Sequence, residues 1–295
     1  MRPTRLEDII GQEKLIQTLN ISINSANKRK DSLGHTILSG PAGLGKTTLA
    51  TAIANELGSD IYVANGASIK NSEKLLNYLI KLEDRDVLFI DEIHRMPISV
   101  YEFLYPVMED FRMDMVEENG EVISDFIEKF TLIGATTELG SLPKPLRDRF
   151  KVQATLETYN KKDISKIIYS NCQSNDLKIT NNAISYLAGV CRGTPRIAIS
   201  LVEWLRDYCI AKGIRVATEA HTEAAMSMKE IGPDGSTLDD RKYLNFLKKQ
   251  NKPVGVSTIS SSINIDVETI ETVIEPWLLS NNKILKTPKG RIIND

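Results

Sequence analysis

The sequence has few of the residues that build metal centres. Its 295 residues include three cysteines and three histidines. The cysteines, at positions 172, 191 and 209, are spaced too far apart to form a metal-binding pair. In an intracellular chain, reduced structural thiols are the simplest interpretation. The composition therefore gives no basis for a zinc cluster.

Long apolar runs are also lacking. No stretch reaches the length of a membrane-spanning helix, and the N-terminus, MRPTRLEDII, has no signal-peptide core. We therefore expect a cytoplasmic protein with no membrane partner. The formal net charge of −2 argues against a surface coated with cations for nucleic acid. A local basic patch is still compatible with that total, because DNA responds to the patch.

An alternation of strands and helices dominates the first half of the chain. The predicted strands lie at residues 35–40, 60–66, 86–91 and 130–137, and the predicted helices at 46–57 and 72–82. Ser72 is the expected cap of the second helix. Continuous apolar strands separated by helices predict a parallel sheet that is covered on both faces.

A different pattern interrupts this alternation between residues 111 and 130. Apolar and polar residues alternate there about Asn119-Gly120, the strongest short signal for a two-residue hairpin turn. The apolar side chains of this segment could dock on a partner or simply cover the sheet. They are Met113, Met115, Val122 and Ile123. We expect a β-hairpin inserted into the parallel-sheet domain.

From about residue 160 the pattern is helical. The predicted helices are 161–172, 181–192, 195–213, 218–229, 240–250 and 266–282. Residues 231–240 are rich in glycine, proline and aspartate and are typical of a linker. The last residues predict two short strands about a Pro288-Lys289-Gly290 turn, as in a winged helix. We therefore predict an α/β fold with a parallel-sheet domain at 1–158, a helical lid at 159–232 and a winged-helix domain at 233–295.

The segment GPAGLGKT, residues 40–47, matches the phosphate-binding motif G-x-x-x-x-G-K-[ST] between a predicted strand and a predicted helix. Glycines let backbone N–H groups curl around phosphate oxygens, and the helix N-terminus adds partial positive charge. We expect Lys46 to reach the β- and γ-phosphates of ATP, and the Thr47 hydroxyl to bind Mg²⁺. A chance match is the alternative, and the order of strand, motif and helix argues against it.

Two acids end a later strand in VLFIDE, residues 87–92. A parallel sheet delivers Asp91 and Glu92 to the edge where the P-loop lies. Asp91 would hold Mg²⁺ through a water, and Glu92 would orient and polarise the attacking water, as ATP hydrolysis requires. Thr137, or Thr136, at the end of the next strand could hydrogen-bond that water or the γ-phosphate. Threonine is also simply common at strand ends.

Two arginines stand close together in PLRDRF, residues 145–150. The segment follows the strand of Thr137 by a short loop, which we expect at the rim of the domain, away from its own P-loop. An arginine there meets a γ-phosphate only if that phosphate belongs to a neighbouring subunit, and guanidinium grips phosphate oxygens bidentately. The alternative is an internal ion-pair cluster with Asp148, which fits Arg147 better than Arg149.

The chain resembles the RuvB family, the bacterial AAA+ ATPases of Holliday-junction branch migration. The resemblance runs nearly end to end, through GPAGLGKTTLA, DVLFIDEIHR, YPVMEDF, FTLIGATT, PLRDRF, RGTPRIA and TPKGR in this order. It implies an AAA+ large domain, a lid and a winged helix. It also implies a homohexameric ring that moves double-stranded DNA by ATP hydrolysis in recombination and repair. A tetrameric RuvA partner would receive the hairpin at 111–130.

The resemblance also assigns site residues. Arg149 matches the arginine finger, with Arg147 as a supporting or interface residue. Arg196 matches the lid arginine called sensor 2, although a surface arginine at a helix start is the alternative. The wing residues Lys286, Lys289 and Arg291 would contact DNA phosphates, unless they are a solvated charge run. The other matches to nucleotide contacts are Met1, Arg2, Gly43, Gly45, Lys46, Thr47, Thr48, Glu109, Asp110, Phe111 and Tyr159.

The chain departs from the family pattern in several places. Glu138 and Val267 take positions where the family often has arginine, and the hairpin is shorter and acidic. Such divergence fits a phage or mobile-element copy. A second class of function is a clamp-loader-like AAA+ subunit that uses ATP as a timing signal, and a third is an ATP-binding protein without motor activity. A basic winged helix favours the motor, because clamp-loader subunits carry a helical collar at that place.

Overall fold

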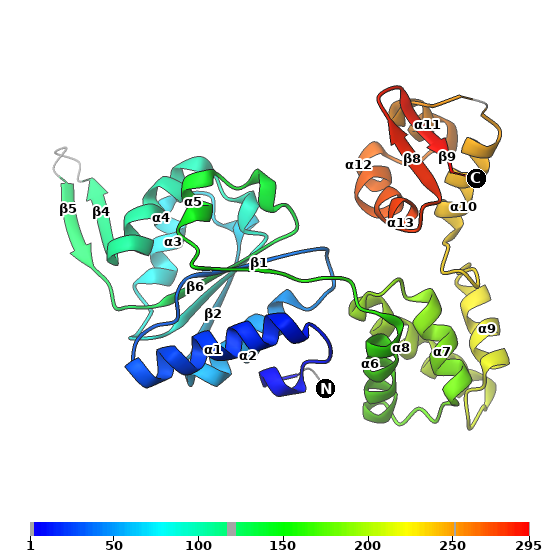
Figure 1. Ribbon diagram of the computed structural model, residues 1–295, viewed down its shortest axis with the longest axis horizontal. Coiled ribbons are helices and arrows are strands. Elements are labelled where there is room, and N and C mark those ends of the chain that lie inside the picture. The colour runs from blue at the N-terminus through cyan, green and yellow to red at the C-terminus, as the bar shows by residue number, and fades with distance from the viewer. Residues whose placement is uncertain (1–2, 117–121, 251, 295) are drawn as a thin grey trace. The chain divides into compact units, whose positions relative to one another are not determined.

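The computed structural model describes residues 3–116, 122–250 and 252–294, with the backbone alone at 115, 116 and 122. It divides into two compact units (Figure 1). The first contains Met1–Asp163 and Thr194–Arg196, and the second contains Ile164–Gly193 and Ile197–Asp295. No helix in the described part of the chain is long and apolar enough to cross a membrane.

A five-stranded parallel sheet forms the centre of the first unit, with strand order β2-β3-β6-β1-β7. The strands are β1 (Thr36–Ser39), β2 (Ile61–Asn65), β3 (Val87–Asp91), β6 (Thr131–Thr136) and β7 (Val152–Thr155). This confirms the predicted fold class and the predicted strands. Strand β7, which pairs with β1 at the edge of the sheet, was not predicted.

Side chains of the strands alternate between two apolar cores, one on each face of the sheet. Leu38, Phe89 and Ile133 face one core, and Ile37 and Leu88 face the other. The covering helices are α1 (Glu13–Arg29) and α2 (Lys46–Leu57) on the first face, and α3 (Ser72–Leu79) and α4 (Ile98–Asp110) on the second (Figure 1). A sheet buried on both faces is what the continuous apolar strands predicted.

Short elements complete the first unit. They are the 3₁₀ turns at Leu6–Asp8, Gly66–Ser68, Ile93–Arg95 and Leu139–Ser141, and helix α5 (Lys144–Asp148). Helix α3 begins at Ser72 as predicted, but its cap is Asn71, whose Oδ1 accepts a hydrogen bond from Lys74 N at 3.0 Å. The prediction of Ser72 as the cap was wrong because Asn71 has the extended backbone and the acceptor that a cap needs.

The inserted hairpin is confirmed. Strands β4 (Arg112–Val116) and β5 (Val122–Phe126) pair antiparallel and form a sheet of their own. The predicted Asn119-Gly120 turn and the acids at 117, 118 and 121 lie outside the described residues, as do the side chains of Met115 and Val122.

The described apolar side chains of the hairpin face two ways. Met113 is buried in the core that the sheet forms with α3 and α4. It therefore covers the sheet, which is the second of the two alternatives that the sequence left open. Ile123 and Phe126 are 45% and 71% exposed. The hairpin thus presents apolar surface to solvent on β5.

The second unit is helical apart from its last two strands. Its elements, together with those that begin at its boundary, are α6 (Lys161–Ser174), α7 (Asn181–Val190), α8 (Pro195–Lys212), α9 (Glu219–Met228), α10 (Leu238–Lys248), α11 (Val256–Ile263), α12 (Val267–Thr269), a π-helical turn (Ile270–Ile274), α13 (Glu275–Ser280), β8 (Ile284–Thr287) and β9 (Gly290–Ile293). The predicted lid helices and the terminal hairpin are confirmed, and α11 adds a helix that was not predicted.

The predicted linker at 231–240 was partly wrong. Helix α10 already begins at Leu238, because Thr237 and Asp240 form a capping box. The Thr237 hydroxyl accepts from Asp240 N at 3.3 Å, and the Asp240 carboxylate accepts from Thr237 N at 2.6 Å. Arg192 also pairs with Asp240, and its guanidinium lies 4.1 Å from the ring of Trp277. These contacts join the end of α7 to the winged helix within the second unit.

A buried carboxylate joins the two wing strands to the helices of the winged helix. Glu275 is 0% exposed and accepts hydrogen bonds from the Tyr243 hydroxyl at 2.9 Å and from Arg291 Nε at 2.8 Å. Its other oxygen lies 2.7 Å from Lys286 Nζ. Burial alone would raise the pKa of Glu275, but the hydrogen bonds from Arg291, Lys286 and Tyr243 lower it overall.

Replacing Glu275 by alanine should destabilise the winged helix by about 3–5 kcal/mol, because it removes the buried acceptor shared by Arg291, Lys286 and the Tyr243 hydroxyl. Hydrogen–deuterium exchange of residues 256–293 in the full chain measures this loss. The stability that Glu275 supplies is present above the unfolded-state pKa and is lost as pH falls through its lowered folded pKa.

The matched control is Glu271→Ala. Its side chain is 45% exposed and pairs with Arg291 at 2.7 Å, so we expect a loss of only about 0–1 kcal/mol. Equal exchange in the two variants would contradict a structural role for the buried carboxylate.

Candidate nucleotide-binding site

The loop between β1 and α2 follows a path that requires glycine. Gly40, Gly43 and Gly45 have φ values of +134°, +81° and +99°, in a region that other residues rarely adopt. A Cβ on Gly40 would lie 2.5 Å from the carbonyl oxygen of Leu156, and one on Gly43 would lie 2.9 Å from Thr194 Cγ2. The loop leads directly into the first turn of α2, where the N–H groups have no partners within the helix.

Lys46 is buried, with 7% of its surface exposed. Its Nζ donates to the carbonyl oxygens of Gly40 at 2.7 Å and Pro41 at 3.0 Å. An ammonium has three donors, so one is left for an anion. Burial lowers the pKa of Lys46, while the nearby carboxylates of Glu92 and Asp91 act in the opposite direction. A buried cation beside a glycine loop fits a phosphate group.

Strand β3 ends at the two predicted acids. Glu92 has a φ of +48°, a strained conformation for a residue with a side chain, and its N–H donates to Asp91 Oδ1 at 3.1 Å. The Thr137 hydroxyl donates to Glu92 Oε2 at 3.4 Å. The structure thus brings Thr137 to Glu92, and it places both acids where their charges act on Lys46.

His94 belongs to the same group of side chains and was not predicted. Its Nδ1 lies 3.3 Å from Glu92 Oε2 and 2.9 Å from the Thr136 hydroxyl. The Thr136 hydroxyl also accepts from Glu138 N at 2.9 Å. Of the two threonines left open by the sequence, therefore, Thr137 is the one whose hydroxyl contacts Glu92. The sequence signal was present in DEIH, a histidine three positions after Asp91.

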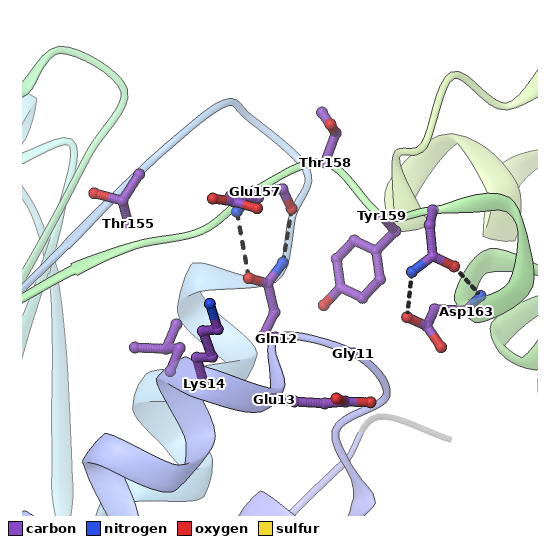
Figure 2. Close-up of a pocket in the computed structure, with 11 residues that line it drawn as sticks. Gly11, Gln12, Glu13, Lys14, Thr155, Glu157, Thr158, Tyr159 and Asp163 are labelled. Atoms are coloured by element: carbon purple, nitrogen blue, oxygen red, sulfur yellow. Dashed lines mark hydrogen bonds between the residues drawn. The ribbon is translucent and has the colours of Figure 1, made fainter.

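A pocket of about 380 Å³ lies between residues 11–15 and 155–163 (Figure 2). Tyr159 lines it, and the Tyr159 hydroxyl donates to the Leu44 carbonyl oxygen of the P-loop at 3.4 Å. The place of Tyr159 near an adenine stays a prediction. A Cβ on Gly11 would lie 3.1 Å from the Tyr159 ring. Gly11 therefore lets the ring approach the backbone closely.

Gln12 holds the other wall of this pocket. Its Nε2 donates to the Glu157 carbonyl oxygen at 2.7 Å, and its Oε1 accepts from Glu157 N at 3.3 Å (Figure 2). At the start of α6, Asn160 and Asp163 exchange hydrogen bonds at 2.8 and 2.9 Å. Gly11 and Gln12 were not assigned to the site from sequence, although the pair GQ stands directly after RPTRLEDII.

Arg196 lies against the P-loop. Its N–H donates to the Gly43 carbonyl oxygen at 3.2 Å, and a Cβ on Gly43 would lie 3.0 Å from Arg196 Cβ. Its charge acts on Lys46. Thr47 and Thr48 lie half-buried in the first turn of α2. The predicted Met1 and Arg2 lie outside the described residues.

Arg149 belongs to a second cluster. It follows α5 directly, where the sequence had suggested a loop, and its NH2 lies 3.0 Å from Glu109 Oε1. Its NH1 donates to the Pro145 carbonyl oxygen at 2.8 Å, and its guanidinium lies 4.4 Å from the centre of the Tyr105 ring. Arg149 thus pairs with Glu109 on α4, not with the adjacent Asp148. Among the described residues, these contacts of Arg149 do not include the P-loop of its own chain, residues 40–47.

The remaining predicted residues are placed as follows. Asp110 is exposed beside Glu109, and Phe111 packs against the rings of His35 and Phe130, at centroid distances of 6.0 and 5.9 Å. In the wing, Arg291 and Lys286 are paired with Glu275. Lys289 is exposed on the turn, and in the described residues it forms no ion pair. The roles of all these residues stay predictions.

Comparison with known proteins gives the family. Family models match three consecutive parts of the chain: the Holliday junction DNA helicase RuvB P-loop domain at residues 1–156, the RuvB AAA lid domain at 159–232 and the RuvB C-terminal winged helix domain at 234–295. The chain belongs to the RuvB family. The resemblance drawn from the motifs is therefore confirmed, and so is the binding of nucleotide that a P-loop domain of this family implies. The domain boundaries stay predictions.

Individual relatives agree along the whole chain. The Holliday junction branch migration complex subunit RuvB of Campylobacter hominis is 42% identical over 297 residues, which cover 99% of this chain and 87% of the relative. The subunit from Clostridium kluyveri is 40% identical over 300 residues, covering 100% and 86%. A solved structure of Thermotoga maritima RuvB, described as a Holliday junction branch migration motor, is 36% identical with a TM-score of 0.89 and covers 100% of this chain and 95% of that one.

Gly40→Ala should disrupt the phosphate loop. Alanine there would have to adopt a φ of +134° with its Cβ 2.5 Å from a carbonyl oxygen, at a cost of about 2 kcal/mol or more. We expect a lower melting temperature, by roughly 4 °C or more, and weaker nucleotide binding. Gly140→Ala is the matched control, since an added Cβ there meets nothing within 4 Å. An unchanged melting temperature for Gly40→Ala would contradict the strained geometry.

Proposed function

We propose that this chain is an ATP-driven translocase of double-stranded DNA that works as a homohexameric ring in Holliday-junction branch migration, during recombination and repair. One observation carries the proposal. A buried P-loop lysine beside Asp91 and Glu92 occurs in the same chain as a winged helix with an exposed cation on its turn. The first group can hydrolyse ATP, and the second can contact DNA phosphates. The chain is an ATP hydrolase of the AAA+ class.

The phosphates of ATP would lie on the glycine loop, with Lys46 and the α2 N-terminus as their positive partners. Mg²⁺ would be held by the Thr47 hydroxyl and, through a water, by Asp91; one hydroxyl and one carboxylate suit an ion that keeps most of its waters and binds phosphate oxygens. That ion would neutralise charge on the phosphates. The adenine would enter the pocket of Gly11, Gln12 and Tyr159, whose ring offers a stacking face.

Hydrolysis needs a water in line with the γ-phosphate and cations around the transferring group. Glu92 would take the role of orienting and polarising that water. Thr137 and His94 hold the Glu92 carboxylate, so the direction in which it points depends on them. Lys46 and Arg196, which both lie at the loop, would stabilise the charge on the phosphate oxygens.

Arg149 would complete the site of a neighbouring subunit. In the described residues its contacts are with α4 and α5, and none of these is with its own P-loop. Guanidinium at such a place suits an arginine finger supplied in trans. The catalytic site would then be complete only in a ring, and ATP hydrolysis in one subunit would depend on the neighbouring subunit that supplies Arg149.

The wing and the hairpin would serve the two other partners. Lys289 on the exposed turn would meet DNA phosphates without reading bases, as a motor that slides over any sequence requires, while Lys286 and Arg291 beside it are paired with Glu275. The exposed Ile123 and Phe126 on β5 would dock on a RuvA-like tetramer that holds the junction. The relatives are named as subunits of a branch migration complex.

Mixing two inactive variants tests the trans arrangement. Arg149→Ala should still bind ATP but lose roughly 10³-fold in turnover, and Lys46→Ala should fail to bind ATP productively. A mixture should recover turnover at hybrid interfaces, where an intact finger meets an intact P-loop. Arg147→Ala is the matched control and should keep its turnover. No recovery, with hybrid rings verified by native mass spectrometry, would contradict the proposal.

The alternative is a clamp-loader-like AAA+ subunit, which would share the P-loop and the arginine finger. The C-terminal segment argues against it, since β8 and β9 form a wing and not a helical collar. Mass photometry with ATP and duplex DNA separates the two functions. Rings of six subunits on DNA are expected for the motor, whereas a five-membered assembly would support the loader.

A further inference from the structure

The Arg149 guanidinium is held from several sides by side chains and backbone of its own subunit. The Tyr105 ring lies 4.4 Å beneath it, Glu109 contacts NH2 at 3.0 Å and the Pro145 carbonyl oxygen contacts NH1 at 2.8 Å. Tyr105 and Glu109 are four residues apart on α4, so both side chains project from one face of the helix. The finger is therefore placed by α4 as well as by its own helix.

The contacts leave much of the guanidinium unused. It has five N–H donors in a planar fork, and NH1 and NH2 each have one further hydrogen beyond these two contacts. Its Nε is buried and, within the described part of the chain, has no hydrogen-bond partner. The side chain is still 21% exposed. The group is thus fixed in orientation and has donors left for an anion.

Tyr105 and Glu109 differ in how strongly they constrain the Arg149 guanidinium. Glu109 is 55% exposed, and an ion pair in water constrains little because solvent screens it. Tyr105 is half-buried, and a ring face attracts a guanidinium more strongly where water is excluded. The ring also sets the plane of the group, which decides where the free N–H bonds point. Of the two, Tyr105 should determine the position of the finger more.

We propose that Tyr105 is the positioning residue of the trans-acting finger, with Glu109 as its weaker assistant. The ring holds the Arg149 guanidinium in one plane before the neighbouring subunit's phosphate arrives. Less conformational entropy is therefore lost when the guanidinium binds that phosphate. This inference rests on the proposed function, in which Arg149 completes a neighbour's site. It adds the residues that make the finger effective.

The test is the DNA-stimulated ATPase rate of full-length variants. Tyr105→Leu should lower kcat by about tenfold and leave the KM for ATP unchanged, because Tyr105 does not line the nucleotide pocket. Tyr105→Phe keeps the ring face and should restore kcat. Glu109→Gln should lower kcat by about twofold to threefold. A raised KM with unchanged kcat in Tyr105→Leu would overturn the proposal.

Phe103→Leu is the matched control. Phe103 is also a half-buried ring on α4, packed on the same core, and no cation contacts its ring in the described residues. It should keep kcat, and its melting temperature should fall as much as that of Tyr105→Leu. An equal loss of kcat in the two variants would show that the effect is general loosening of α4, and the positioning role would be wrong.

A double-mutant cycle separates this proposal from the proposed function. If Tyr105 acts through Arg149, Tyr105→Leu should lower the single-turnover rate no further in an Arg149→Ala background. A further tenfold loss there would overturn the positioning role while the finger itself stands. If Arg149→Ala alone leaves turnover unchanged, the trans finger fails and the positioning role fails with it.

Discussion

The phosphate groups of a nucleotide concentrate negative charge in a small volume. The groups that bind them must therefore lie close together, and this requirement constrains the whole first unit. Parallel strands end at the same edge of a sheet. β1 therefore delivers the glycine loop to that edge, β3 delivers Asp91 and Glu92, and β6 delivers Thr136 and Thr137. The strand register brings them level, since Ser39 pairs with Thr136 and Ile90 pairs with Gly134. The covering helices then bury both faces of the sheet.

Much of this could be predicted because the signals are local. Helix α2 and strands β1, β2, β3 and β6 have the periodicity and apolar runs that define them. Most of the missed elements lack such signals, although in α1 the buried Leu19, Ile23 and Ala26 do recur at helical spacing. Helix α1 begins at Glu13, and its N-cap Gln12 makes no side-chain cap hydrogen bond. Helix α4 contains Pro106, α11 is rich in serine, and β7 is an edge strand with one buried residue of four. Tertiary contacts decide these segments, and a single sequence does not show them.

The candidate site divides in the same way. Motifs located Lys46, Asp91 and Glu92, and the structure places them together. The partners that hold Glu92 are Thr137, which the sequence offered for a different contact, and His94, which the sequence did not assign. In the wing, the sequence shows three cations, but only the structure shows that a buried Glu275 holds Arg291 and Lys286. The net electrostatic character of the turn therefore depends on Lys289.

The central claim is that Arg149 acts on a neighbour's nucleotide, and images of the full chain in a ring test it most directly. The sample would contain an ATP analogue and a synthetic four-way junction, studied by electron cryomicroscopy. The account predicts six subunits around duplex DNA, with each Arg149 guanidinium within about 3 Å of the adjacent subunit's γ-phosphate. A ring in which Arg149 stays on Glu109 and contacts no nucleotide would contradict it.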